Sequence, residues 1–167
     1  MRRVLITGMS GTGKSTVIER LRVMGRKAID TDWDPRWEQP DADGVWVWRE
    51  EAIDALLNQE DTDVLFVSAC VPNQGRFYDR FDAVILLSAP ESVTVQRLAD
   101  RTNNPYGKSH DEISEVLGYK DTVEPQLRKR ATAEIDTTIS ISDVILRILE
   151  IAEPHRDPSY DSTKSGD

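Results

Sequence analysis

Short apolar runs alternate with amphipathic stretches along the chain as far as residue 152. The runs with the length and composition of β-strands are 4–7, 27–30, 64–67, 83–87 and 134–137. Apolar residues spaced three or four positions apart predict helices at 17–24, 48–57, 90–100, 110–130 and 140–152. This alternation predicts an α/β fold of three layers, with about five strands in a parallel sheet and helices on both of its faces.

The runs at 64–67 and 83–87 are continuously apolar, which is typical of central strands that helices cover on both faces. Two other segments interrupt the pattern. Residues 33–44 contain two prolines and a glycine, and residues 101–109 contain two asparagines, a proline and a glycine. Both are expected to be loops, with a broken helix as the alternative for the first.

The length of 167 residues suits one domain, which we expect to span 1–153, followed by a mobile polar tail at 154–167. The single cysteine, Cys70, excludes an internal disulfide and is typical of a reducing, cytoplasmic compartment. No apolar run reaches the roughly 18–20 residues of a membrane helix. The net charge of −9 argues against nucleic-acid and membrane partners, because both need a basic surface. A monomer and a homodimer are both compatible with these features.

The segment 8–15 carries a complete chemical motif. Its residues, Gly-Met-Ser-Gly-Thr-Gly-Lys-Ser, match the pattern GxxxxGK(S/T), with a strand before it and a helix after it. Glycines in such a loop let backbone N–H groups approach phosphate oxygens. Lys14 is expected to reach the β- and γ-phosphates of ATP, and the Ser15 hydroxyl to bind Mg²⁺. The expected nucleotide contacts of the loop are Gly8, Gly11, Thr12, Gly13, Lys14, Ser15 and Thr16.

From this motif onward the chain resembles the small P-loop kinases, a group that includes nucleoside monophosphate kinases, shikimate kinases and gluconate kinases. It also resembles bacterial proteins described as AAA-family ATPases or as shikimate-kinase-like. The resemblance implies the P-loop NTPase fold, an acceptor-binding region at 33–60 and a short lid at 101–110. Asp30-Thr31-Asp32 is similar to the Asp-Thr-Asp of shikimate kinases. There, one aspartate orders water around Mg²⁺ and the other contacts the acceptor hydroxyl.

Three arginines extend the resemblance. The stretch from Arg97 to Arg101 resembles the helix that enters the lid of these kinases, and Arg128 is placed like an arginine of the next helix. The resemblance implies that Arg97 lies along the adenine and that Arg101 and Arg128 contact the phosphates. Residues four apart lie on one helix face, so Arg97 and Arg101 can act together. The alternative for each arginine is a solvated surface position.

The chain departs from the shikimate kinases after the run 64–67. Ser68 stands where a Walker B aspartate is expected, so metal positioning is expected from Ser15 and Asp30. The stretch Ser68-Ala69-Cys70 also replaces the Gly-Gly-Gly of shikimate kinases, which argues against shikimate as the acceptor.

The region 30–61 is strongly acidic, with Arg36 and Arg49 as its arginines. A nucleoside monophosphate brings a dianionic phosphate that needs cationic donors, so the acidic excess favours a hydroxyl-bearing acceptor. Asp32 is the candidate base for that hydroxyl, and Asp30 is the candidate metal ligand. Turn residues that cap the next segment are the structural alternative for both.

Further candidates for acceptor contacts lie nearby. Arg49 could bind an acidic group, and Asn73 and Gln74 follow the run 64–67 at the edge where ligands bind in open α/β sheets. Four tryptophans, at 33, 37, 46 and 48, either form an aromatic wall or pack a small subdomain.

Together these features predict an ATP-dependent phosphotransferase that moves the γ-phosphoryl group to a hydroxyl of a small metabolite. Its expected catalytic residues are Lys14, Asp32, Arg101 and Arg128. A nucleoside monophosphate kinase is the first alternative. A nucleotide-dependent ATPase or switch protein, whose output is a conformational change, is the second.

Overall fold

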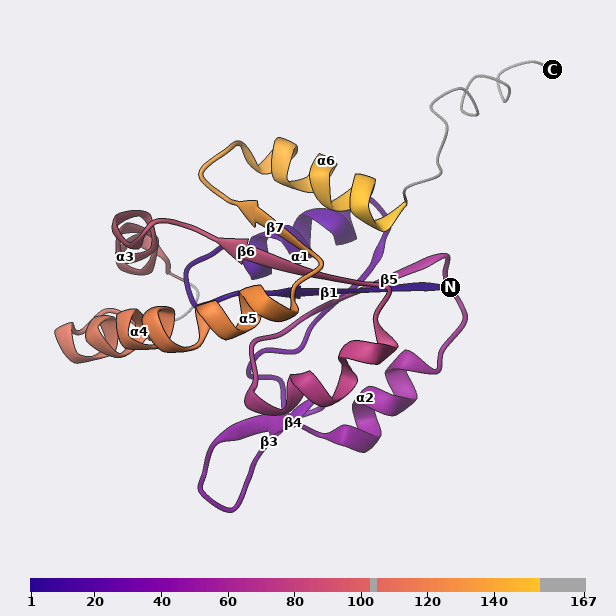
Figure 1. Ribbon diagram of the computed structural model, residues 1–167, viewed down its shortest axis with the longest axis horizontal. Coiled ribbons are helices and arrows are strands. Elements are labelled where there is room, and N and C mark those ends of the chain that lie inside the picture. Colours follow the sequence, from indigo (N-terminus) through magenta and orange to yellow (C-terminus); the bar gives the residue numbers. More distant parts are fainter. Residues whose placement is uncertain (103–104, 154–167) are drawn as a thin grey trace.

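The chain folds around a parallel sheet of five strands (Figure 1). The computed structural model describes residues 1–102 and 105–153, so the expected tail at 154–167 and positions 103–104 of the expected lid lie outside the described residues. The strands lie in the order β2-β5-β1-β6-β7, and all neighbouring pairs are parallel. Their bounds are β1 Arg2–Thr7, β2 Lys27–Asp30, β5 Val64–Ser68, β6 Ala83–Ser88 and β7 Ala133–Asp136. The predicted α/β class and five-stranded parallel sheet are confirmed.

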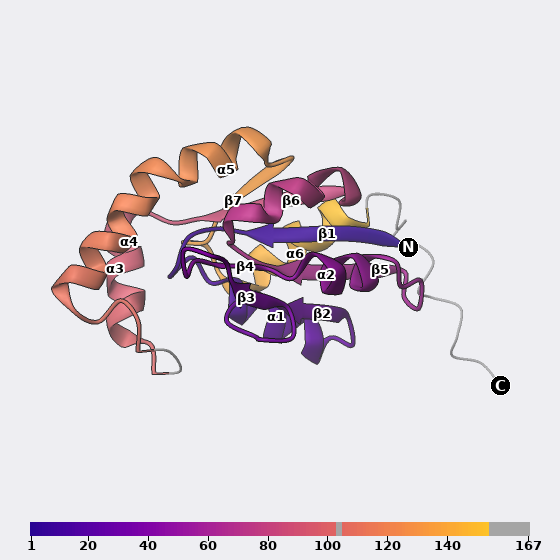
Figure 2. The same ribbon diagram turned by 90° about the horizontal axis from the view of Figure 1, so that it is seen from below.

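Helices cover both faces of this sheet (Figures 1 and 2). They are α1 Lys14–Val23, α2 Glu50–Leu57, the 3-10 helix η1 Pro72–Arg80, α3 Glu91–Asp100, α4 His110–Thr122, α5 Glu124–Arg130 and α6 Ile141–Ala152. The helices α1 and α6 pack on one face, whereas α2, η1 and α5 pack on the other. Because side chains alternate along a strand, Ile6 of β1 is buried in the first core and Leu5 in the second.

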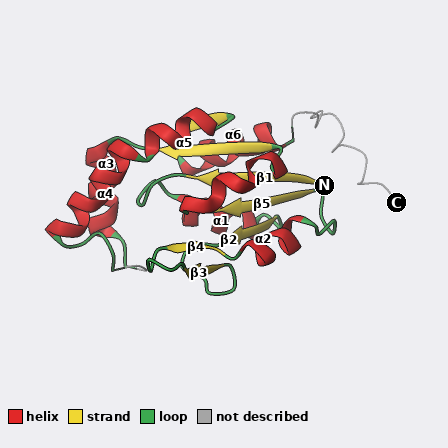
Figure 3. Cartoon of the chain, turned by 60° about the horizontal axis from the view of Figure 1, so that its bottom comes forward, coloured by secondary structure: helices red, strands yellow, loops and turns green. Residues whose placement is uncertain are grey.

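The carboxyl ends of the five parallel strands meet at one edge of the sheet, where ligands bind in folds of this kind. The segment 8–13 leaves β1 at this edge, and Asp30 ends β2 there. The helices α3 and α4 extend beyond the same edge (Figure 3). None of the described helices is long and apolar enough to cross a membrane.

Residues 33–44 differ in part from the predicted loop or broken helix. They include the strand β3 Glu38–Pro40, which forms an antiparallel hairpin with β4 Trp46–Trp48, separate from the main sheet. Trp48 therefore belongs to a strand and not to the predicted helix, which begins at Glu50. Strands of three residues are too short to show a clear alternation of apolar and polar positions, and Pro40 argued against a strand.

The predicted helix at 110–130 is two helices, α4 and α5, that meet at Val123. Pro125 explains the break, because proline has no N–H to donate and its ring clashes with the carbonyl of the residue four positions earlier. It is tolerated in the first turn of α5, where no intrahelical donor is needed.

Candidate active site

The phosphate loop, residues 8–15, turns sharply between β1 and α1. Gly8 has φ 151°, and a Cβ at this position would lie 2.4 Å from the carbonyl oxygen of Leu87. Gly13 caps α1 with φ 96°, a left-handed conformation that favours glycine. The Thr12 hydroxyl donates to the carbonyl of Met9 at 2.8 Å. The first turn of α1 contains no acidic residue, so its positive end is available to an anion.

Lys14 is the buried cation of this loop, with 8% of its surface exposed. Its Nζ donates to the carbonyl of Gly8 at 2.8 Å and lies 3.3 Å from Oδ2 of Asp32. Burial alone would lower the pKa of Lys14, but the negative groups around it, Asp32 foremost, raise that pKa above its usual value. The amine is therefore held protonated between the loop and a carboxylate.

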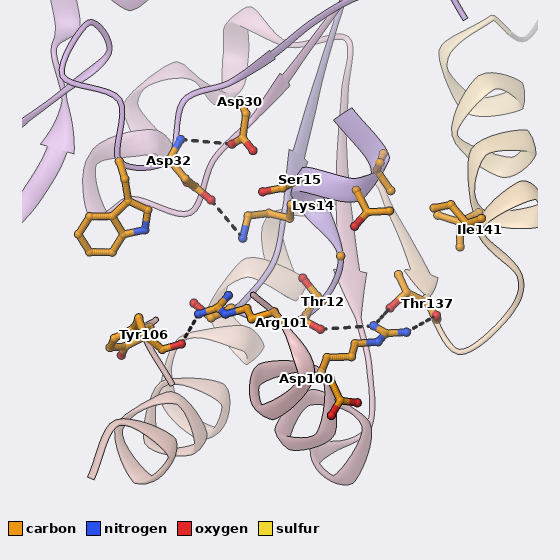
Figure 4. Close-up of a pocket in the computed structure, with 18 of the residues that line it drawn as sticks. Thr12, Lys14, Ser15, Asp30, Asp32, Asp100, Arg101, Tyr106, Thr137 and Ile141 are labelled. Atoms are coloured by element: carbon orange, nitrogen blue, oxygen red, sulfur yellow. Dashed lines mark hydrogen bonds and ion pairs between the residues drawn. The ribbon is translucent and has the colours of Figure 1, made fainter. Parts of the chain in front are cut away.

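A cavity of about 930 Å³ runs along the phosphate loop, which lies between its two ends (Figure 4). A volume of this size is typical of sites for small ligands. Asp30, Asp32 and Tyr106 lie at the first end, which we call the carboxylate end. Trp33, which follows Asp32 in the chain, also lines the cavity. The second, which we call the apolar end, is lined by Arg97, Thr137, Ile139, Ile141 and Val144.

Arg97 joins three elements at the apolar end. Its guanidinium donates to the Thr137 hydroxyl at 2.7 Å and to the Thr137 carbonyl at 2.6 Å, and to the carbonyl of Gly11 at 3.3 Å. These bonds link α3 to the phosphate loop and to the end of β7. They engage the edge of the guanidinium, and its flat face is suited to stacking on a planar ring. Arg97 is therefore brought to the site that the sequence predicted.

Arg101 follows α3 and also lines the cavity. Its guanidinium donates to the carbonyl of Tyr106, which links the end of α3 to the segment before α4. Lys108 does not line the cavity. Its Nζ donates to the carbonyls of Ala99 at 2.7 Å and Arg101 at 2.5 Å, and so caps the C-terminal end of α3. Among the described residues that line the cavity, the cations are Lys14, Arg97 and Arg101.

Asp30 and Asp32 stand together at the end of β2. Asp30 accepts a hydrogen bond from the backbone N–H of Asp32 at 3.3 Å. Oδ1 of Asp32 accepts from the backbone N–H of Cys70 at 3.1 Å, while Oδ2 lies toward Lys14. Asp30 is also the partner of Ser68 in the register of β2 and β5. Its carboxylate thus stands next to the position at which the sequence lacks a Walker B aspartate.

The turn after Asp32 holds a residue in an unfavourable backbone conformation. Trp33 has φ 62°, and no other non-glycine residue within 1–102 and 105–153 has a positive φ. For a bulky residue the left-handed region costs about 1–2 kcal/mol. The backbone N–H of Trp33 donates to Oε2 of Glu38 at 3.0 Å, so the hairpin fastens this turn.

Glu38 is a residue of this site that the sequence analysis did not single out. It is 3% exposed, and its Oε1 has no hydrogen-bond partner among the described residues. Burial, assisted by the carboxylates of Asp32 and Asp30, raises the pKa of Glu38 to about 7. In a segment rich in acidic residues no local signal distinguishes Glu38, because its burial depends on the hairpin.

This buried carboxyl predicts an unusual pH dependence of stability. The folded state keeps the Glu38 proton up to about pH 7, whereas the unfolded chain releases it near 4.5. The contribution of Glu38 to folding therefore becomes less favourable as the pH rises from about 4.5 to 7, and is constant above that. Glu38→Gln keeps an oxygen for Trp33 but cannot ionise, so at pH 8 we expect it to be more stable than wild type by about 2–3 kcal/mol.

Urea unfolding of both proteins at pH 5 and pH 8 measures this difference. The exposed substitution Glu51→Gln is the control and should follow the wild-type profile. Parallel pH profiles for Glu38→Gln and wild type would show that Glu38 ionises normally in the folded state.

Some residues predicted for the site do not line the cavity. They are Arg49, Asn73, Gln74 and Arg128. Arg49 donates to the carbonyl of Pro35. Arg128 forms ion pairs with Glu124 at 2.9 Å and Glu134 at 2.8 Å, which raise the pKa of its guanidinium. Its charge is therefore matched within the chain, and its role toward phosphate stays a prediction without structural support.

Asn73 and Gln74 make contacts within the protein. The amide of Asn73 accepts from the backbone N–H of Trp48 at 2.9 Å and donates to its carbonyl at 3.0 Å, so it holds the end of the hairpin. The buried amide of Gln74 donates to the hydroxyls of Thr7 at 3.0 Å and Tyr78 at 2.9 Å. Both side chains are therefore bonded within the protein, and their predicted contact with an acceptor stays a prediction.

The oxygen atoms of Ser15, Asp30 and Asp32 suit Mg²⁺. No group of three or more His, Cys, Asp or Glu side chains among the described residues could hold a metal by itself. Mg²⁺ needs only one or two carboxylates when phosphate oxygens and water complete its coordination. The donor set therefore fits a metal that arrives with a nucleotide.

Comparison with known proteins agrees with this geometry. A family model described as an AAA domain matches residues 4–118. The chain belongs to this AAA domain family. No curated protein matches the sequence. Similar solved structures show that this AAA domain protein has the fold of the small P-loop kinases. The resemblance seen in the sequence implied this fold.

Three of these structures illustrate the likeness. Shikimate kinase from Acinetobacter baumannii, in complex with shikimate, has a TM-score of 0.64 and 18% identity, with 93% of this chain and 95% of that chain covered. Shikimate kinase from Bacteroides thetaiotaomicron has a TM-score of 0.65 and 20% identity, with 91% and 98% covered. A gluconokinase from Sinorhizobium meliloti has a TM-score of 0.58 and 17% identity, with 92% of each chain covered. At these identities the likeness shows the fold of the AAA domain protein and leaves its substrate open.

Proposed function

We propose that the chain is an ATP-dependent kinase that transfers a phosphoryl group to a hydroxyl of a small molecule. One observation carries the proposal: Oδ2 of Asp32 lies 3.3 Å from Nζ of Lys14 within a single cavity. Phosphoryl transfer needs a cation at the transferred group and a proton acceptor beside the attacking hydroxyl. The family membership and the fold support the same interpretation.

Asp32 is the proposed base. As the acceptor oxygen bonds to the γ-phosphorus, its proton passes to Oδ2 of Asp32, and the bond between the γ-phosphorus and the bridging oxygen breaks, so that ADP leaves with the electron pair. The hydrogen bond from Cys70 to Oδ1 keeps the carboxylate in one orientation. The products are ADP, a phosphate ester and a proton.

The remaining groups neutralise charge and orient the nucleotide. Lys14, Arg101 and the N-terminus of α1 are the proposed cationic partners of the phosphates, and Arg97 at the apolar end is the proposed partner of the adenine. Ser15 and Asp30 would hold Mg²⁺, which supplies further charge neutralisation at the phosphates when it is bound.

Acceptor-dependent formation of ADP tests this function. The purified chain is incubated with Mg²⁺ and ATP, together with sugars, sugar acids, cyclitols or nucleoside monophosphates, and new phosphate esters are identified by mass spectrometry. We expect one class of hydroxyl compound to be phosphorylated. With it, ADP forms at least about tenfold faster than without acceptor, because an oriented hydroxyl reacts faster than water.

Two results would favour the alternatives. Equal ADP formation with and without every acceptor would support a nucleotide-dependent ATPase or switch. Transfer to nucleoside monophosphates alone would support the other kinase class, although the acidic segment beside the cavity is poorly suited to their phosphate.

A further inference from the structure

The segment that follows β2 brings no cation to the cavity. Residues 30–57, between the end of β2 and the end of α2, contribute two carboxylates and the indole of Trp33 to the cavity lining. The arginines of this segment lie outside that lining. Arg36 is paired with Asp34 at 2.5 Å, and Arg49 donates to the carbonyl of Pro35. An acidic group on the acceptor would therefore face carboxylates of this segment and no cation from it.

The cations that line the cavity, among the described residues, are the ones that we assign to the nucleotide. Lys14 and Arg97 are bonded to carbonyls of the phosphate loop, and Arg101 is bonded to the carbonyl of Tyr106. Lys14 also lies 3.3 Å from Asp32, so its positive charge is shared between this carboxylate and the phosphates that we assign to it. Asp30 is the proposed ligand of Mg²⁺, and the described lining cations are the proposed partners of the nucleotide, so this end suits an uncharged acceptor better than an acidic one.

The same end presents an aromatic surface. Trp33 is 59% exposed and lines the cavity, and the exposed ring of Trp46 meets it edge to face, with centroids 6.0 Å apart at 60°. Trp48, by contrast, is fully buried, and its indole N–H donates to the Thr31 hydroxyl at 2.8 Å. Two of the tryptophans therefore lie at the surface next to the proposed base.

Trp33 occupies this position in an unfavourable backbone conformation. Its left-handed φ of 62° is one that bulky residues rarely adopt, and the hydrogen bond from its N–H to the buried Glu38 fixes the turn. A strained residue whose large apolar ring is left at the mouth of a cavity is typical of a binding position.

We infer that the carboxylate end binds an uncharged, ring-shaped polyol, a free sugar or a cyclitol, whose C–H face stacks on Trp33 while one hydroxyl is bonded to Asp32. This inference rests on the proposed kinase function and names the class of its acceptor. The C–H face of such a ring is apolar and its rim carries hydroxyls, so it matches an indole beside a carboxylate.

Matched pairs of ligands test the inference. The full chain with Mg²⁺ and a non-hydrolysable ATP analogue is titrated with glucose against glucuronate, galactose against galacturonate, and myo-inositol, and binding is followed by saturation-transfer NMR. Transfer from ATP to each compound is measured in parallel. Uridine and kanamycin represent nucleosides and amine-bearing polyols. We expect at least one neutral polyol to bind and to be phosphorylated, in preference to its acid.

Substitutions at Trp33 test whether the preference for a neutral acceptor depends on stacking against this indole. Trp33→Ala should raise the KM for the neutral acceptor about tenfold, with the KM for ATP changed less than twofold, whereas Trp33→Phe should keep most of the affinity. Leu146→Ala, which removes an equally exposed apolar side chain on the outer side of α6, is the control and should change neither constant.

The outcomes separate the inference from the function on which it rests. Phosphorylation of only the acids, the nucleoside or the amine would overturn the inference and leave the kinase function standing. Binding of a neutral polyol that depends on Trp33, without transfer from ATP, would support the binding site and overturn the kinase function. A complete lack of Trp33-dependent binding among the neutral polyols would overturn the inference.

Discussion

Lys14→Ala is expected to reduce phosphoryl transfer by at least about 100-fold and to weaken ATP binding by about 10- to 100-fold. The side chain is the buried cation of the phosphate loop and donates to the Gly8 carbonyl at 2.8 Å. A charged hydrogen bond to phosphate contributes about 1.5–3 kcal/mol to binding. The loss of such a donor where charge develops during the reaction lowers the rate by about 10²–10³-fold. Titration with ATP and steady-state formation of ADP measure the two effects.

A second substitution separates charge from packing. Lys14→Met keeps the length of the side chain without its charge, so it should lose the same activity while filling the same space. Thermal unfolding of both variants is needed as well, because Asp32 loses its partner at 3.3 Å in either case. An affinity for ATP that is unchanged in folded Lys14→Met would contradict the assignment of the phosphate loop.

Asp32→Asn is expected to lower kcat by about 10²–10⁴-fold while the affinity for ATP changes less than about threefold. An amide can still accept the hydrogen bond from Cys70, but it cannot take a proton from the acceptor hydroxyl. The loss should therefore appear in the chemical step and not in nucleotide binding. Single-turnover transfer to the acceptor, combined with ATP titration, measures the separation.

The neighbouring Asp34 provides a matched control for this change. It lies two residues further on, and it is paired with the exposed Arg36 outside the cavity. Asp34→Asn makes the same chemical substitution in the same turn, so it should retain nearly full kcat. If Asp32→Asn also retained kcat within about threefold, Asp32 could not be the base.

The features of the fold that the sequence predicts correctly are those encoded by local pattern. Continuous apolar runs identify β5 and β6, since a strand covered on both faces must be apolar on both. The hairpin at 38–48 carries no such signal, because each of its strands is three residues long. Pro125 marks the break between α4 and α5, but apolar residues keep a regular helical spacing across it, so the pattern predicts one continuous helix.

The site shows the same division between local motif and long-range contact. The phosphate loop and the position of Asp30 and Asp32 at a strand end follow from residues that are close in sequence. Arg128 has a place in the sequence that suits a phosphate contact, but Glu124 and Glu134 surround its guanidinium, and no spacing rule reveals those partners. Glu38 is buried by packing against the turn at Trp33, which only the folded hairpin creates.

The nucleotide side and the acceptor side of the cavity are built differently along the chain. The phosphate loop, α3 and the start of α6 come from three distant parts of the sequence. At the carboxylate end, by contrast, all the described lining residues except Tyr106 lie in one segment, together with Glu38 and Trp46, which contact Trp33. That segment includes a small hairpin sheet apart from the central five strands. Substrate choice can therefore diverge among relatives by the exchange of a single insert, and the same segment offers a natural unit for grafting new specificity onto an unchanged phosphate-binding scaffold.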